Sequence, residues 1–234
     1  MRRKNPAFPV TCLFLTAAFC FLVAQSVRIP SGFGNPEYIG ELASRSGALN
    51  LVASVYLDGR LYDTIFELIV FSVAVLGVRF YLSERKPSAR PAPIPESHVV
   101  RASAEVLFPF ILLLGIYLTA YGGLSPGGGF AGGTVAASGL MLCTIAIGAN
   151  AVARRIGQAS LERLEWGLPL AVIALAIVPT FLGNPPLAEI LPTGRGGGIF
   201  ASGSILLYNL LIGIKVFIGS WIVIHGFIEH RGEI

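Results

Sequence analysis

The stretch Gly122–Gly133, GGLSPGGGFAGG, contains seven glycines in twelve residues and lies between two long apolar runs. Glycine loses more conformational freedom on folding than other residues, so this density in an ordered segment requires a structural reason. Ser125 and Pro126 form a typical turn opener, and the three glycines that follow permit backbone conformations closed to other residues. The stretch therefore predicts a tight turn between two helices.

Beyond the turn, small residues recur every four positions, in the series Gly128, Gly132, Ala136 and in the series Gly129, Gly133, Ala137. This spacing allows membrane helices to approach closely and pack by van der Waals contact. We assign turn and helix-packing roles to Ser125, Pro126, Gly127, Gly128, Gly129, Gly132 and Gly133. A phosphate-binding loop is excluded because the pattern GxxxxGK[ST] is absent.

The composition indicates an integral membrane protein. The 234 residues are 54% hydrophobic and 13% charged, with a mean hydropathy of +0.73, whereas soluble domains carry about 25% charged residues. The net charge of +4 does not indicate nucleic-acid binding, because the basic residues lie between apolar runs rather than on a soluble face. Cys12, Cys20 and Cys143 lie inside apolar runs without metal-ligand spacing, so we expect no metal and no cofactor.

Six runs of about 20 apolar residues predict an all-α, polytopic membrane protein with six transmembrane helices. The runs are Phe8–Val27, Tyr62–Leu82, Ala104–Gly122, Phe130–Asn150, Trp166–Leu182 and Ile199–Phe227. One set of connecting segments holds eleven Lys and Arg residues and the opposite set holds four, which predicts cytoplasmic N- and C-termini and a glycine turn on the outer side. The first run is also compatible with a signal peptide.

A proline-rich segment divides the chain. SERKPSARPAPIPESHVV, from Ser83 to Val100, contains four prolines and cannot continue a helix. We predict a two-helix module over residues 1–83, a cytoplasmic linker over residues 84–100 and a four-helix module over residues 101–234. Within the first module, Gly47–Asp58 is apolar but too short to span a bilayer, so it is expected to lie along the surface or to re-enter the membrane.

Four ionisable residues in or near the spans are candidates for an ion or proton path: Asp63, Glu67, Lys215 and His225. Charges near the middle of a bilayer are costly and usually face partners or water. Burial disfavours the charged form of a carboxylate and of an ammonium, which suits a proton relay. The alternatives are a helix-terminus role for Asp63, a static buried pair for Glu67 and Lys215 or a carbonyl-bonded Lys215, and a structural role for His225.

The glycine stretch resembles the signature of the MnhB family, the B subunit of Mrp-type sodium/proton antiporters, and equally that of a related subunit of membrane-bound hydrogenases. The family form is approximately G-H-[NL]-[ST]-P-G-G-G-F-x-G-G, and Lys215 in NLLIGIKV matches a second motif, N-L-x-x-G-x-K-V. The resemblance covers about Arg101 to Phe227. It departs from the family at Tyr121 and Gly123, where histidine is common.

The N-terminal module resembles the C-terminal part of the antiporter's large A subunit, whose pattern is N-x-V-x-x-I-L-V-D-x-R-x-x-D-T-x-x-E. The matching positions here are Asn50, Asp58, Arg60, Asp63, Thr64 and Glu67. The chain therefore resembles a fusion of two neighbouring subunits joined by the proline-rich linker.

The resemblance implies an accessory, non-catalytic subunit of a multisubunit cation/proton antiporter in a prokaryotic inner membrane. Its implied partners are the other subunits, the lipid bilayer, and Na⁺ or H⁺. The alternative is an ion-translocation subunit of a hydrogenase-like or other redox complex related to respiratory complex I. A purely structural scaffold is a third possibility.

Overall fold

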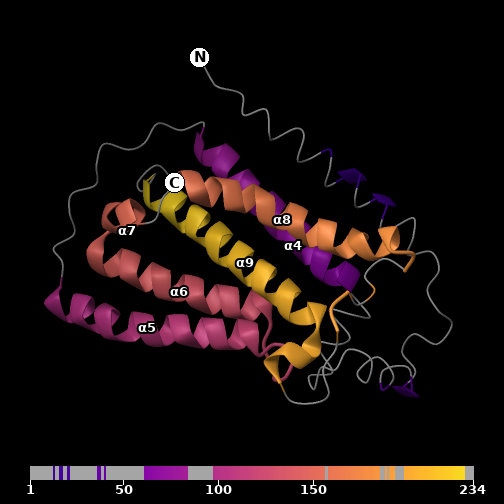
Figure 1. Ribbon diagram of the computed structural model, residues 1–234. Coiled ribbons are helices and arrows are strands. Elements are labelled where there is room, and N and C mark those ends of the chain that lie inside the picture. Colours follow the sequence, from indigo (N-terminus) through magenta and orange to yellow (C-terminus); the bar gives the residue numbers. More distant parts are fainter. Residues whose placement is uncertain are drawn as a thin grey trace.

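All the regular structure in the described part of the chain is helical (Figure 1). The computed structural model describes residues 61–83, 97–155, 158–184 and 198–229, with isolated positions at 13, 16, 17, 20, 21, 36, 37, 40, 188 and 190–192. The helices are α4 (Leu61–Ser83), α5 (His98–Ala120), α6 (Gly129–Ile147), α7 (Ala149–Arg155), α8 (Gln158–Phe181) and α9 (Ser204–Glu229), with a 3₁₀ turn η2 (Ile199–Ser202). Most of the predicted first span, the segment Gly47–Asp58 and linker residues 84–96 lie outside the described residues.

Five of the described helices, α4, α5, α6, α8 and α9, are long and apolar enough to cross a membrane. They coincide with the last five predicted spans, which confirms the prediction of an all-α, polytopic membrane protein. Four boundaries differ from the prediction by three or more residues. Helix α5 begins at His98, before the predicted end of the linker at residue 100, and α9 begins at Ser204 rather than Ile199, after the 3₁₀ turn. Helix α6 ends at Ile147 because Gly148 adopts a φ of 85°, and α8 begins at Gln158 rather than Trp166. Helix α8 begins earlier because it includes the polar residues before Trp166, which a search for apolar runs leaves out.

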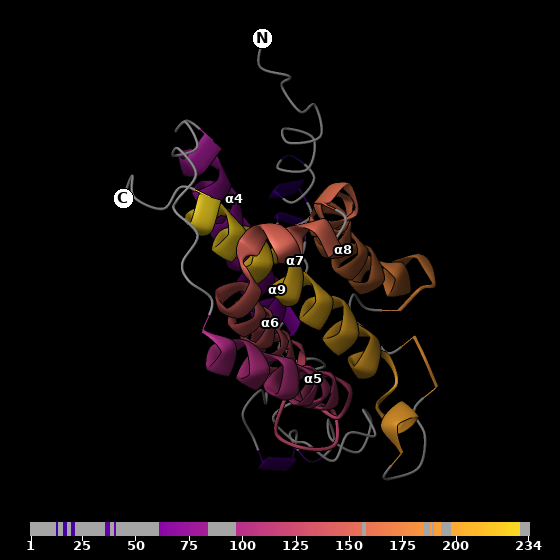
Figure 2. The same cartoon turned by 90° about the vertical axis from the view of Figure 1, so that its left-hand side faces the viewer.

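Helix α9 occupies the centre of the bundle. It lies between the pair α5–α6 on one side and the pair α4–α8 on the other, as the two perpendicular views show (Figures 1 and 2). An apolar core cluster joins α4, α8 and α9 through residues that include Leu68, Val172 and Ile212. The helix from the N-terminal module therefore packs directly against two helices from the C-terminal module.

The glycine-rich turn sets the position of α6. The predicted turn connects α5 to α6, and the N–H of Gly128 donates to the carbonyl oxygen of Leu118 at 3.0 Å. Gly128 has a φ of 129°, a backbone conformation that favours glycine. Asn209 on α9 accepts a hydrogen bond from the N–H of Gly129 at 3.0 Å, through its side-chain Oδ1. A residue distant in the sequence thus satisfies a free N–H at the start of α6.

The two series of small residues on α6 face two different helices. A Cβ added at Gly132 would lie 2.5 Å from the carbonyl oxygen of Gly115 on α5. A Cβ added at Gly133 would lie 2.6 Å from the carbonyl oxygen of Gly213 on α9. At these two positions the absence of a side chain permits backbone-to-backbone contact, of Gly132 with α5 and of Gly133 with α9.

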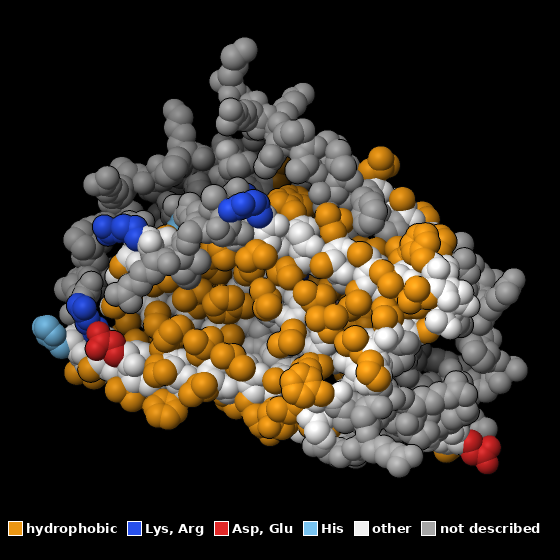
Figure 3. All heavy atoms as spheres, in the orientation of Figure 1, with side chains coloured by type: hydrophobic (Ala, Val, Ile, Leu, Met, Phe, Trp, Pro, Cys, Tyr) orange, Lys and Arg blue, Asp and Glu red, His pale blue; other side chains and the backbone are white. Residues whose placement is uncertain are grey.

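The surface over α5 and α6 is mainly apolar (Figure 3). Helix α5 exposes large apolar side chains along its length, among them Val106, Phe110 and Leu113. Most of the charged side chains visible on this face lie toward the end where α5 begins, where Arg101 pairs with Glu105. This distribution suits a helix bundle whose apolar band lies in a bilayer.

The packing of α6 predicts a difference between two Gly→Ala substitutions. Gly133→Ala places a methyl group against the backbone of α9, and we expect a loss of about 1–3 kcal/mol of stability from overpacking. Gly167→Ala, on an open face of α8, meets nothing within 4 Å and serves as the matched control. Thermal aggregation of the detergent-solubilised protein measures both. Equal midpoints for the two variants would contradict the close contact between α6 and α9.

Candidate functional site

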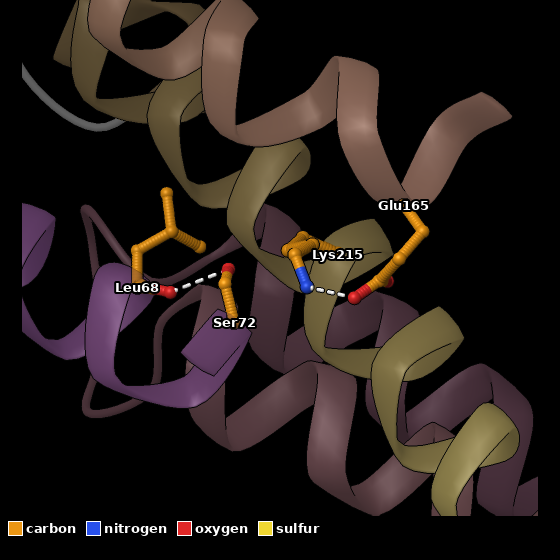
Figure 4. Close-up of polar contacts among 4 residues, drawn as sticks. All are labelled: Leu68, Ser72, Glu165 and Lys215. Carbon is orange, nitrogen blue, oxygen red and sulfur yellow. Dashed lines mark hydrogen bonds and ion pairs between the residues drawn. The ribbon is translucent and has the colours of Figure 1, made fainter. Parts of the chain in front are cut away.

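Lys215 lies in the middle of α9 and its side chain is 0% exposed. An isolated ammonium at this depth in a membrane is costly, so it requires a partner. Its Nζ donates a hydrogen bond to Oε1 of Glu165 on α8 at 2.5 Å (Figure 4). Lys215 is therefore buried inside the bundle, and its partner is a carboxylate from the neighbouring helix.

Glu165 was not among the residues selected from the sequence. The predicted span began at Trp166, which placed Glu165 outside the membrane, whereas the helix begins earlier and Glu165 is only 4% exposed. The missed signal is the helical spacing of Glu165 with Leu168 and Val172, two apolar residues that face the core. A carboxylate on the same helix face as these apolar residues is directed into the protein core.

The pair is only partly satisfied by hydrogen bonds. Within the described part of the chain, Oε2 of Glu165 is buried and has no hydrogen-bond partner. Buried ion pairs are usually stable only when further hydrogen bonds satisfy the remaining polar atoms. The free oxygen therefore leaves Glu165 able to bind an additional donor, such as water.

Helix α4 closes the third side of the site. The ring centroid of Phe71 lies 5.1 Å from Nζ of Lys215. One residue further along, the Ser72 hydroxyl donates to the carbonyl oxygen of Leu68 at 2.7 Å, and its side chain rises from α4 on the side where Lys215 lies (Figure 4). The Lys215 ammonium is thus enclosed by α4, α8 and α9.

The other residues predicted for an ion path lie at different positions along α4 and α9. Glu67 lies on an exposed face of α4, and the structure does not bring it together with the buried Lys215. Asp63 lies in the first turn of α4, but its side chain is outside the described residues. His225 is buried, and its ring centroid lies 5.2 Å from that of Trp221 on the same helix.

The predicted turn residues form a second polar region, at the N-terminal end of α6. Ser125 donates to the carbonyl oxygen of Tyr121 at 3.3 Å. Asn209, also absent from the residues selected for a role, has a buried amide nitrogen, Nδ2, without a hydrogen-bond partner among the described residues. A Cβ at Gly122 would lie 2.7 Å from that nitrogen. This region is arranged for close packing around a capped helix.

The chemistry available at the site is proton exchange and charge compensation. The described residues contain no group of three or more His, Cys, Asp or Glu side chains placed to hold a metal ion. A buried lysine and carboxylate, enclosed by three membrane helices, are instead groups that typically mark ion and proton paths. The fold and the site together define a helical membrane protein with a charged pair in its core.

The comparisons with known proteins identify the family. The chain belongs to the family described as a domain related to the MnhB subunit of Na⁺/H⁺ antiporters, whose model matches residues 99–222. The match includes both Glu165 and Lys215. With five apolar helices in the part that the structure describes, the chain is a multi-pass protein of the prokaryotic cell membrane.

The chain is similar to several proteins of related type. It is 28% identical over 195 residues to an uncharacterised protein of Methanocaldococcus jannaschii, covering 73% of each chain. It is 35% identical over 95 residues to a protein of Staphylococcus epidermidis designated antiporter subunit mnhB2, covering 40% of this chain and 67% of the other.

Two solved membrane complexes contain similar chains. A chain of the membrane-bound sulfane sulfur reductase, an archaeal respiratory membrane complex, has a TM-score of 0.69 and 28% identity, with 93% of this chain and 97% of the other covered. A chain of the Mrp complex from Dietzia sp. has a TM-score of 0.62 and 20% identity, and its match covers 99% of this chain but 27% of the longer one. The second likeness shows a shared fold.

The buried pair predicts non-additive effects on stability. Lys215→Met alone leaves the Glu165 charge buried and unpaired, which costs about 3–5 kcal/mol and lowers the melting temperature by roughly 6–20 °C. Glu165→Leu combined with Lys215→Met replaces the pair by apolar side chains and is expected to restore a stability close to that of the wild type.

Thermal unfolding of the solubilised protein measures this cycle. Arg101→Met is the matched control, because its ion pair with Glu105 is exposed and contributes less than about 1 kcal/mol. A double variant as unstable as the sum of its single variants would show that the two residues do not interact.

Proposed function

We propose that the chain is an accessory membrane subunit of a multisubunit cation/proton antiporter, in which it contributes part of an ion or proton path and supports assembly. The observation that carries this proposal is the fully buried Lys215–Glu165 pair inside the segment that matches the antiporter family. The likeness to a protein designated antiporter subunit mnhB2 supports it. The chain itself has no catalytic role in this proposal.

The Lys215–Glu165 pair serves as the protonatable element of the path. It lies deep within the bundle, where a change in the charge of either partner alters the electrostatic field that a passing ion meets. His225 lies ten residues further along α9, and it is the next buried ionisable side chain along the described part of that helix. We assign it to the side of the path predicted to face the cytoplasm.

Glu67 serves a second part of the path, at a contact with another subunit. It is exposed on the surface of this chain, on a face of α4 that also presents the apolar Val70 and Val73. A carboxylate on an apolar membrane helix normally faces protein or water rather than lipid. We propose that a partner subunit covers this face, and that Asp63, one turn away on the same helix, lies beside it.

The N-terminal module supplies α4 to both parts of the path. Residues 1–83 correspond in this proposal to the C-terminal part of an antiporter A subunit, fused through the proline-rich linker to the MnhB-like module. Helix α4 supports this arrangement because one of its faces packs against α8 and α9 while Glu67 lies on an exposed face. The helix therefore connects the buried pair to the subunit surface.

A second candidate function has specific support. The chain matches a subunit of the sulfane sulfur reductase complex over nearly its full length and with a higher identity than it matches the Mrp complex. The same subunit would then move ions within a redox-driven respiratory complex. Purification of the native complex and identification of its subunits by mass spectrometry separates the two: antiporter subunits alone support the first candidate, and iron–sulfur subunits support the second.

The proposal predicts a loss of transport in Glu67→Gln. This substitution keeps the shape of the side chain but removes its charge, so the complex should assemble while sodium-dependent proton exchange in inverted membrane vesicles is abolished. Glu105→Gln is the matched control, because Glu105 is exposed and paired with Arg101 near the start of α5. Exchange at the wild-type rate in Glu67→Gln would remove Glu67 from the path.

A further inference from the structure

The Lys215 ammonium has a second neighbour besides Glu165. An ammonium offers three N–H donors, and the described residues provide one hydrogen-bond acceptor, Oε1 of Glu165. The face of the Phe71 ring lies on another side, with its centroid 5.1 Å from Nζ. This distance is within the range of about 6 Å over which an aromatic quadrupole attracts a cation, an attraction that is strongest where water is absent.

The position of the Phe71 ring is fixed by two further contacts. Gly219 lies one turn after Lys215 on α9, and a Cβ added there would lie 2.5 Å from Cε1 of the ring. The ring therefore rests directly on the α9 backbone beside the ammonium. On another side, the Phe130 ring of α6 meets Phe71 edge to face, with centroids 6.3 Å apart and an interplanar angle of 88°.

We propose that Phe71 is a positioning residue for Lys215. Its ring binds the ammonium through a cation–π contact, stabilises the charged lysine in the apolar core and holds it against Glu165. The contact itself follows from the geometry, whereas its importance for transport rests on the proposed function of the Lys215 site. Because Phe71 belongs to α4, the environment of the α8–α9 ion pair is complete only when the N-terminal module is docked.

The test replaces Phe71 with phenylalanine carrying one, two or three fluorine atoms on the ring, introduced by nonsense suppression into the whole complex. Fluorine withdraws electron density from the ring face with little change in size. We expect sodium-dependent exchange to fall in steps, to about a tenth of its rate with three fluorines. The midpoint temperature of thermal unfolding of the chain should fall in parallel, by about 2–4 °C.

Phe130 provides the matched control. It belongs to the same aromatic pair and has the same size, but among the described residues it is the Phe71 ring that faces the Lys215 ammonium. The same fluorine series at position 130 should produce no graded loss. Equal losses at both positions would indicate a packing effect and would overturn the proposal, as would the absence of any trend at position 71.

A second background separates this inference from the proposed function. In the Glu165→Leu, Lys215→Met variant the ammonium at position 215 is absent, so fluorination of Phe71 should leave the midpoint temperature of unfolding unchanged. A trend that persists in this background would overturn the cation–π contact. A trend in the midpoint temperature of unfolding without one in exchange rate would retain the contact and reject a role for Lys215 in transport.

Discussion

The ion pair between Lys215 and Glu165 is the constraint around which this bundle is organised. A lysine that is 0% exposed inside a membrane protein requires a counter-charge, and α8 supplies it at a hydrogen-bonded distance. The requirement fixes the relative position of α8 and α9, and the Phe71 ring brings α4 to the same place. The three helices therefore enclose the Lys215–Glu165 ion pair among apolar core residues.

The opposite side of α9 is organised by small residues rather than by charge. The two series on α6 bring its backbone against α5 and α9, so that α6 approaches α9 without large intervening side chains. Asn209 caps the start of α6 from α9, which places the glycine turn and the central helix in a fixed relation. Phe130 at the end of the turn then meets Phe71, so the packing region and the charged region share one aromatic contact.

Much of this arrangement could be predicted from sequence because it depends on local patterns. Apolar runs predict five of the described spans, and the four-residue spacing of small side chains predicts close helix contacts. Glu165 was missed because a run of apolar residues cannot identify a charged residue whose helix face is buried. The separation of Glu67 from Lys215 could not be predicted from the sequence either, because it depends on how α4 is rotated relative to α9. The sequence of one chain also does not show which of its helix faces other subunits cover.

Helix α4 lies between the enclosed Lys215–Glu165 pair and the exposed carboxylate of Glu67, and we propose that both belong to a larger membrane complex. The central claim is that the Lys215–Glu165 pair takes part in transport and is more than a structural contact. Proton movement driven by a sodium gradient, measured in vesicles containing the assembled Glu165→Leu, Lys215→Met complex, tests this claim most directly. The account predicts an intact complex with no sodium-dependent proton movement, and movement at the wild-type rate would contradict it.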